Sequence, residues 1–286
     1  MKTDIHSTVT AAIVAQLEAG DAPWSRPWTS VGGNRHLRAN GQPYKGINTL
    51  ILALSGRPGG HWFTYKQASE LGAQVRGGEK STSVVFFKPL KVEDKANAGQ
   101  LKTIPLLRSY NVFHQDQIDN LPAKYTAPAV ATPSLVRDDF ADAAFAATGA
   151  QVNHGGSSAH YVPSQDYIQM PAIETFHSVE AYYATLAHEL THWTGHKSRL
   201  DRNLTTTHGT KDYAREELIA ELGAAFICVE LGVESSPRAD HASYLQSWID
   251  VLKEDSKAIF AAAAAAQKAA DFVLAFSAED TLEEAA

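Results

Sequence analysis

The segment that most constrains this chain is a His-Glu-x-x-His motif formed by His188, Glu189 and His192. Residues four apart on a helix lie on the same face, so both imidazoles can bind one metal ion. Zinc accepts such nitrogen donors and keeps one position open, while the glutamate can take a proton from water. The motif therefore predicts a helix that carries a zinc-dependent hydrolytic site. The alternative interpretation is an ordinary helix whose surface carries these three side chains by chance.

Two helices are predicted around this motif. Ser178 is a suitable N-cap, apolar residues follow it at helical spacing, and Gly195 marks the end of the first helix. A polar loop follows, and a second helix is predicted over residues 212–231. Small residues on one face of this second helix predict that it packs closely against the helix of the histidines.

The second helix is predicted to supply the missing metal ligand. A histidine pair on zinc requires a third protein ligand, and we predict that Glu217 provides it. Glu221 lies one turn further along and is predicted to accept the free N–H of a ligand histidine, which fixes its tautomer. Glu216 is expected on a solvated face. A tyrosine or histidine is expected to stabilise the oxyanion, and Tyr213 is one candidate.

Basic and acidic residues are distributed unevenly between the two halves of the chain. Residues 1–130 contain 15 Lys and Arg against 9 Asp and Glu, whereas residues 131–286 contain 10 against 23. Only the first half is therefore expected to meet a polyanion. The single cysteine, Cys228, excludes an internal disulfide framework and is expected in the core. Because we expect no apolar run of membrane-spanning length and no signal peptide, a cytoplasmic location is predicted.

Aromatic and cationic residues alternate in the first half without a helical or strand period. Cations can neutralise phosphates, and exposed aromatic rings can stack on unpaired bases. This combination indicates binding to single-stranded DNA, against the alternative that the aromatics are core residues and the lysines are simply solvated. The candidate residues are Trp24, Arg26, Trp28, Arg35, Arg38, Tyr44, Lys45, Trp62, Tyr65, Lys66, Arg76 and Lys80.

The order of predicted elements favours an α+β fold with two domains. Residues 1–120 form a mixed domain whose core is expected to be covered by an amphipathic helix over residues 4–20. Residues 121–135 contain three prolines and are predicted to be a linker. Residues 136–286 form the second domain, where an edge strand over residues 160–168 is predicted to pair with an extended peptide.

Two groups of motifs follow one another along the chain. The first half contains Pro-Trp-Ser-Arg-Pro-Trp at 23–28, Tyr-Lys-Gly-Ile-Asn at 44–48, Trp-Phe-Thr-Tyr-Lys-Gln-Ala at 62–68 and Val-Arg-Gly-Gly-Glu-Lys at 75–80. The second half contains Asp-Tyr-Ile-Gln-Met-Pro at 166–171, Arg-Leu-Asp-Arg at 199–202 and the segments 188–196 and 216–226. Together they resemble the ArdC antirestriction family, in which a single-stranded-DNA-binding domain, also found in plasmid primases, precedes a zincin-like metallopeptidase domain.

The resemblance implies a protein of a mobile element that protects incoming DNA from host restriction. It supports zinc binding by Glu217, because residues 217–221 match a Glu-x-x-Ala-acid pattern of related peptidases. The chain departs from the longer metzincin motif at one position. Ser198 stands where that motif has its third histidine. His196 and His208 are therefore kept as minor candidate ligands.

Three functions are compatible with these features. In the first, a zinc metallopeptidase joined to a DNA-binding domain cleaves an unidentified peptide or protein substrate. In the second, the protein coats single-stranded DNA, and its metal domain is structural or binds a partner without proteolysis. Glu189 counts against the second function, because a structural zinc does not need it. In the third, the acidic second half mimics DNA and binds a host restriction enzyme, but its acids are spread among unrelated positions.

Overall fold

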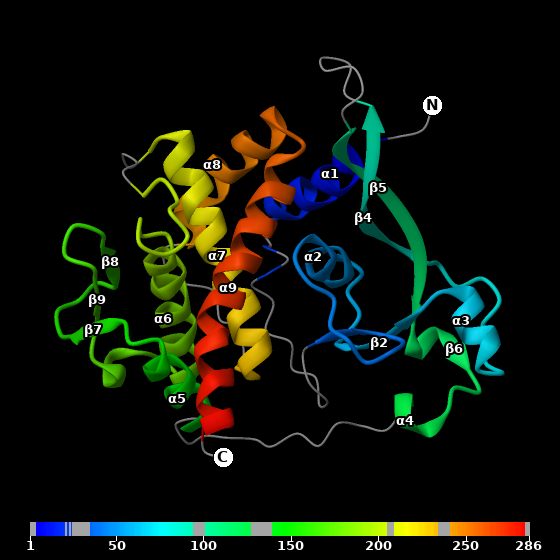
Figure 1. The fold of residues 1–286 in the computed structure, drawn as a ribbon, viewed down its shortest axis with the longest axis horizontal. Helices are drawn as coiled ribbons and strands as arrows, with labels where there is room; N and C mark the ends of the chain where they lie inside the picture. Colours follow the sequence, from blue (N-terminus) through cyan, green and yellow to red (C-terminus); the bar gives the residue numbers. More distant parts are fainter. Residues whose placement is uncertain are drawn as a thin grey trace. The chain divides into compact units, whose positions relative to one another are not determined.

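The computed structural model describes residues 4–20, 22, 24, 35–93, 101–126, 139–204, 209–233 and 241–283 of the chain (Figure 1). Helices and strands are mixed along the sequence, which confirms the predicted α+β class. The chain forms two compact units. One contains Met1–Arg35 together with Ala129–Ala286, and the other contains His36–Pro128.

The N-terminal helix α1 (Ile5–Glu18) belongs to the unit that contains the second half of the chain. Its buried stripe includes Ile13, and it packs against α8 (His241–Glu254). Thr10 Oγ1 donates a hydrogen bond to the carbonyl oxygen of Ser256 over 2.7 Å. The prediction that this helix covers the core of the first domain is therefore wrong. An apolar stripe predicts that a helix face is buried, but not which core buries it.

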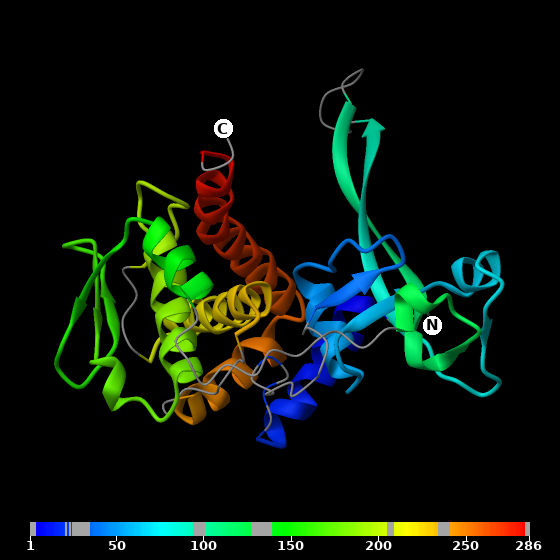
Figure 2. The same ribbon diagram turned by 90° about the horizontal axis from the view of Figure 1, so that it is seen from below.

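A four-stranded sheet with the order β1-β2-β5-β4 lies at the centre of the unit of residues 36–128. β1 pairs in parallel with β2, and the other neighbours are antiparallel. The long strands β4 and β5 continue as a two-stranded ribbon that extends away from the rest of this unit (Figure 2). The strands are β1 (His36–Arg38), β2 (Gly60–Phe63), β4 (Thr82–Glu93) and β5 (Leu101–His114).

Helix α2 (Ile47–Leu54) is fixed to the edge strand β4 by the side chain of Asn48. Asn48 Nδ2 donates to the carbonyl oxygen of Val85, and the Val85 N–H donates to Asn48 Oδ1, both over 2.8 Å. The amide thereby satisfies backbone groups at the outer side of the sheet. The smaller elements of this unit are α3 (Tyr65–Glu70), β3 (Gln74–Val75), η1 (Gln115–Gln117), β6 (Ile118–Asp119) and α4 (Ala123–Thr126). The predicted linker, residues 121–135, contains α4, and residues 127–135 lie outside the described residues.

A buried histidine, His36, lies beside Trp62 in this unit. Trp62 Nε1 donates a hydrogen bond to His36 Nδ1 over 3.1 Å, and the two rings meet edge to face. Burial and the nearby His114 lower the pKa of His36 to about 4. The imidazole is therefore neutral in the folded chain at neutral pH.

We expect acid to destabilise this unit through His36. Because its folded pKa is about 4 and its ordinary value is 6.5, only the unfolded chain gains this proton as pH falls between these values. The free energy of unfolding therefore decreases across this range, by roughly 3 kcal/mol at most. Chemical denaturation at a series of pH values measures the decrease. His36→Asn, whose amide oxygen can accept the Trp62 N–H, is expected to reduce the slope; an unchanged slope would contradict this assignment.

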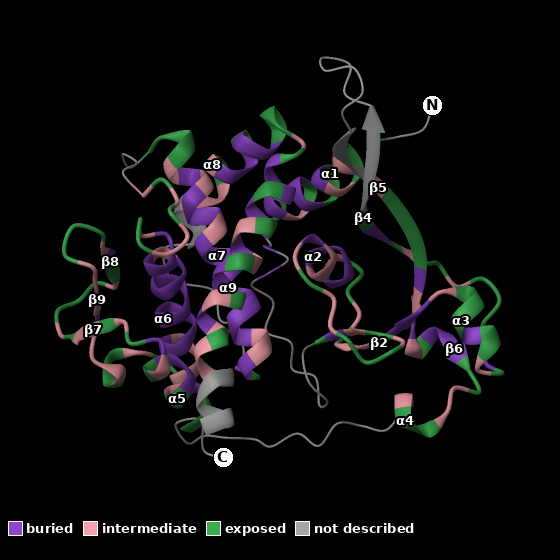
Figure 3. Cartoon of the chain, viewed as in Figure 1, coloured by how far each residue is buried: buried purple, intermediate pink, exposed green. Residues whose placement is uncertain are grey.

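The other unit consists mainly of helices that pack around α7 (Lys211–Leu231). This helix contacts α6 (Val179–Thr194), α8 and α9 (Ala258–Glu283). Residues of α6 and α7 are buried along most of their length (Figure 3). Besides α1, the remaining helices of this unit in the described residues are α5 (Asp139–Ala147) and the short η2 (Ile173–Thr175).

A three-stranded sheet with the order β7-β9-β8 lies against α6. β7 (Gln151–His154) pairs in parallel with β9 (Tyr167–Met170), and β8 (His160–Val162) pairs antiparallel with β9. An edge strand is thus present where one was predicted. It is shorter than predicted, because the chain turns through residues 163–166 into β9.

Among the described residues, one helix is long and apolar enough by length and composition to cross a membrane, namely Ala258–Ser277 within α9. This corrects the expectation that no apolar run reaches that length. Ten of these 20 residues are alanines. Ala263, Ala266 and Ala270 are fully buried, and α9 packs against α5, α6 and α7. The small side chains allow this close packing between helices.

Candidate metal centre

Helix α6 carries the His-Glu-x-x-His motif, and both predicted helices are present. Ser178 Oγ caps α6 by accepting a hydrogen bond from the Ala181 N–H over 3.1 Å, and the helix ends immediately before Gly195. Thr210 Oγ1 caps α7 by accepting a hydrogen bond from a backbone N–H over 3.2 Å. Gly232 follows α7 with a φ of 73°, a conformation that favours glycine at a helix end.

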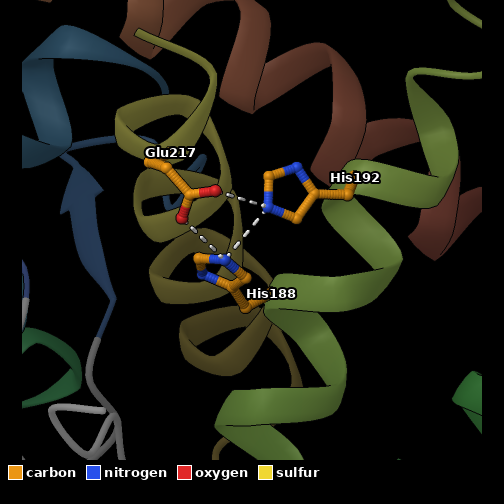
Figure 4. Close-up of side chains that lie close together, drawn as sticks. All are labelled: His188, His192 and Glu217. Atoms are coloured by element: carbon orange, nitrogen blue, oxygen red, sulfur yellow. Dashed lines mark hydrogen bonds and ion pairs between the residues drawn. The ribbon is translucent and has the colours of Figure 1, made fainter. Parts of the chain in front are cut away.

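His188, His192 and Glu217 converge on one point between α6 and α7 (Figure 4). The two Nε2 atoms are 3.1 Å apart, and oxygens of Glu217 lie 3.6 Å from His188 Nε2 and 3.5 Å from His192 Nε2. Three donors that each lie about 2.0–2.1 Å from a tetrahedral zinc ion are separated from one another by about 3.3–3.4 Å. The two distances from Glu217 are to different carboxylate oxygens, and one ligand atom from each of the three residues lies within 4.8 Å of the others, so the three side chains are close enough together to hold one ion.

Carboxylates lie behind both imidazoles. His188 Nδ1 lies 3.4 Å from Glu221 Oε1, within ion-pair distance, and His192 Nδ1 hydrogen-bonds with Glu216 Oε1 over 3.2 Å. With a proton on each Nδ1, the Nε2 lone pairs face one another and the Glu217 carboxylate. Three electron-rich donors at this spacing repel one another unless a cation lies between them. The donor set therefore fits a divalent ion.

The sequence predicted that Glu216 lies on a solvated face. This prediction is wrong, because Glu216 is buried and only 7% exposed. Arg202 donates to both of its carboxylate oxygens, over 2.9 and 3.1 Å. Arg202 also donates to Thr194 Oγ1 and to the carbonyl oxygen of Thr191. Burial by itself raises the pKa of Glu216, but the hydrogen bonds from His192 and Arg202 outweigh burial and lower it. An ionised Glu216 thus connects a metal-site histidine to an arginine that is anchored on α6.

Arg202 was missed as a site residue by sequence reasoning, although it belongs to the Arg-Leu-Asp-Arg motif. We expect Arg202→Ala to weaken zinc binding by about 10- to 100-fold, because Glu216 loses the partner that orients it toward His192. Isothermal titration of metal-free protein with zinc measures the change. Arg215→Ala is the matched control, since Arg215 is partly exposed on α7 and pairs with Asp212. Equal zinc affinity in the two variants would contradict the positioning role of Arg202.

Glu189 lines the same cavity as the three ligand residues and is itself buried. The cavity has a volume of about 250 Å³. Its lining includes His160 and Tyr161 of β8 and, from other elements, Tyr213 and Tyr244. One cavity is therefore lined by Glu189, by the three candidate ligands and by residues of the edge strand β8.

Of the two minor ligand candidates, His196 is described by the structure, and it is not part of the ligand cluster. His196 Nδ1 instead hydrogen-bonds with Ser198 Oγ over 2.8 Å, and His208 lies outside the described residues. The candidate oxyanion stabiliser, Tyr213, has its hydroxyl 3.2 Å from that of Tyr244. Burial and this hydrogen bond raise the pKa of Tyr213, so its hydroxyl keeps the proton it would donate.

Both halves of the chain match known families. Residues 3–113 match the N-terminal domain of anti-restriction factor ArdC, and residues 139–265 match a zincin-like metallopeptidase family. The metal-free crystal structure of the antirestriction ArdC protein from plasmid R388 is 46% identical, with a TM-score of 0.83, over 96% of this chain and 98% of that one. The chain belongs to the ArdC antirestriction family. The Mn(II)-bound crystal structure of the R388 protein matches over the same shares with a TM-score of 0.80.

Three further relatives are similar to nearly the whole chain, and two of them are much longer proteins. Two DNA primases TraC of Escherichia coli are 40% identical over 301 and 304 residues. Each match covers 99% of this chain, but the chain spans only 20% and 28% of the primases. The uncharacterized protein y4eC of Sinorhizobium fredii (strain NBRC 101917 / NGR234) is 38% identical over 95% of this chain and 92% of y4eC.

Two of the aromatic residues predicted to contact DNA lie in the protein core. Trp24 is 4% exposed and packs against Trp248, and Trp62 is 1% exposed and contacts His36. The prediction that these two residues stack on bases is wrong, because their rings are already covered by protein. Arg26 and Trp28 lie outside the described residues.

The remaining candidates for DNA binding differ in their surroundings. Tyr65, Lys45 and Lys80 are exposed. The guanidinium of Arg38 lies 5.3 Å from the centre of the Tyr44 ring, so these two predicted residues are adjacent. The other cations lie near carboxylates, namely Arg35 at 3.0 Å from Glu230, Lys66 at 3.6 Å from Glu70 and Arg76 at 2.9 Å from Glu79.

Proposed function

We propose that this member of the ArdC family is a zinc-dependent peptidase that also binds single-stranded DNA. We further propose that it is carried by a mobile element and protects incoming DNA from restriction in the cytoplasm. The observation that carries the proposal is the convergence of His188, His192 and Glu217 beside Glu189 in one cavity. Family membership supports the antirestriction role.

The peptidase reaction follows from the chemistry of the cavity. When bound, zinc supplies a Lewis acid and lowers the pKa of water. Glu189 takes a proton from the attacking water and returns it to the leaving amine. The protonated hydroxyl of Tyr213 is our candidate donor to the oxyanion, because it lines this cavity. Burial of the site excludes competing water around the carboxylate that moves the proton.

The edge strand β8 is the proposed docking place for the substrate. Its residues His160 and Tyr161 line the cavity that contains Glu189. β9 pairs with one side of β8, and an extended peptide can pair with the other side as an added strand. Main-chain pairing of this kind requires an unfolded or extended substrate segment, so we propose that class of substrate.

The charge distribution supports DNA binding by the smaller unit. Residues 36–128 contain 12 Lys and Arg against 6 Asp and Glu, a net charge of +6. Because the whole chain has a net charge of −7, the remaining residues have a net charge of −13. A polyanion is therefore attracted to one unit and repelled by the other.

A restriction-protection assay tests whether proteolysis matters for the antirestriction role. Cells that produce wild-type protein or Glu189→Gln receive unmodified conjugative DNA, and the surviving transconjugants are counted. We expect wild-type protein to protect and Glu189→Gln to lose most of this protection. Equal protection by both proteins would favour the alternative function, in which the smaller unit coats DNA without proteolysis. Salt-sensitive binding of a purified restriction enzyme without DNA would instead favour DNA mimicry by the acidic residues.

A further inference from the structure

One face of the β4–β5 ribbon changes from buried to exposed within residues 84–86 and 108–112. Alternate residues of a strand share a face, so Val84 and Phe86 lie on one face together with Val112 and Tyr110 of the paired strand. Val84 and Val112 are buried in a cluster with Leu52 of α2. Next to this cluster, Phe86, Arg108 and Tyr110 on the same face are exposed, and Figure 3 shows the exposed stretch of β5.

Two large aromatic side chains occupy the open part of this face. Phe86 and Tyr110 are each 52% exposed. They are diagonal neighbours across the two strands, and their ring centres are 6.5 Å apart at an angle of 64°. Large apolar groups that remain exposed side by side often mark a binding surface. Cross-strand packing alone accounts for their contact with each other but not for the ring area left open to solvent.

A cation lies beside these rings. Arg108 is directly opposite Phe86 in the strand register and is exposed. Within the described residues, no carboxylate lies at ion-pair distance from its guanidinium. The two strands contain the cations Lys88, Lys91, Lys102 and Arg108 against the single acid Glu93. The ribbon therefore combines exposed aromatic rings with an excess of positive charge.

We propose that Phe86, Arg108 and Tyr110 form a ribbon face that binds unpaired bases of single-stranded DNA. Phe86 and Tyr110 stack on bases, and Arg108 contacts a neighbouring phosphate. Bases within a duplex already stack on one another, so this face selects single strands. The inference rests on the proposed DNA-binding function and assigns it to specific residues, none of which was among the sequence-based candidates.

The test uses two fluorescently labelled oligomers and the full chain. One is an oligothymidylate of about 20 nucleotides, long enough for sites of roughly 4–16 nucleotides, and the other is an abasic oligomer with the same number of phosphates. Fluorescence anisotropy gives the affinity of wild-type protein and of the double variant Phe86→Leu/Tyr110→Leu. We expect the variant to bind oligothymidylate about 10- to 100-fold more weakly and to bind the abasic oligomer as wild-type protein does.

Further variants separate stacking from charge. Arg108→Gln is expected to weaken binding of both oligomers alike and to lower the slope of log affinity against log salt concentration by about 0.7. Phe140→Leu is the matched control, because Phe140 is 59% exposed but lies on α5 of the acidic unit. This control should bind both oligomers as wild-type protein does. Circular dichroism and zinc titration check that each variant is folded.

The outcomes distinguish the ribbon face from the wider proposal. If the double variant lost the same affinity for both oligomers, base stacking would be overturned. The two rings would then serve only to stabilise the β4–β5 ribbon. Unchanged oligothymidylate affinity in that variant would overturn the ribbon face but leave DNA binding by another surface. Absence of binding by wild-type protein would overturn the proposed DNA-binding function itself.

Discussion

Replacement of Glu189 by glutamine is expected to abolish peptide hydrolysis while zinc binding stays intact. The amide keeps the shape of the side chain but cannot take a proton from water, and general base catalysis of this kind contributes about 10²- to 10⁴-fold to a rate. Cleavage of unfolded casein or of a mixed fluorogenic peptide library measures the loss. The zinc content of the same samples shows that the ligands remain in place.

A matched control for this variant lies on the same helix. Glu180 is in the first turn of α6, partly exposed and outside the cavity. Glu180→Gln should hydrolyse the same substrates as wild-type protein. If Glu189→Gln were as active as Glu180→Gln, Glu189 could not be the proton acceptor.

Replacement of Gly223 by alanine is expected to destabilise the contact between the two helices that hold the metal ligands. An added Cβ would lie 2.5 Å from both Oγ1 and Cγ2 of Thr191. Helix propensity favours alanine over glycine by about 1 kcal/mol, but overpacking of this kind typically costs about 1–3 kcal/mol. Because the backbone of α6 or of α7 must move to relieve this contact, we expect the free energy of unfolding to fall by about 2 kcal/mol. Thermal denaturation of metal-free protein measures it.

A second substitution tests the cause of this destabilisation. Thr191→Ala removes both atoms that lie 2.5 Å from the added Cβ and leaves a Cβ contact at 3.1 Å. The double variant Gly223→Ala/Thr191→Ala should therefore be more stable than the sum of the two single effects predicts. Thr191 lies between His188 and His192 on α6, so the single variant Gly223→Ala should also bind zinc more weakly. Strict additivity of the two stability changes would contradict a steric origin.

Local patterns were sufficient to predict the centre of the metal site. The spacing of His188 and His192 is a property of one helix, and the capping residue Ser178 marks where α6 begins. Glu217 followed from the need of zinc for a third ligand. Its contact with both histidines in the structure depends on packing between two helices whose facing residues include small side chains.

Features that depend on long-range packing were not predicted. Glu216 was expected in solvent because neighbouring positions on a helix usually point in different directions, toward the core and toward water. α7 contacts α6, α8 and α9, so it has little solvated face at this point. The same limit applies to Trp62, since its residue type fits a core position and a stacking surface equally well. Only the fold places it in the core and leaves Phe86 and Tyr110 exposed.

The most direct test of the metal centre is calorimetric zinc titration of metal-free wild-type protein and of Glu217→Ala. We expect wild-type protein to bind one zinc ion per chain tightly, and we expect Glu217→Ala to lose this binding because two histidines alone do not hold the ion. Glu174→Ala, an exposed glutamate of the same unit, should bind zinc as wild-type protein does. Undiminished zinc binding by a folded Glu217→Ala variant, or no binding by wild-type protein, would contradict the proposed site.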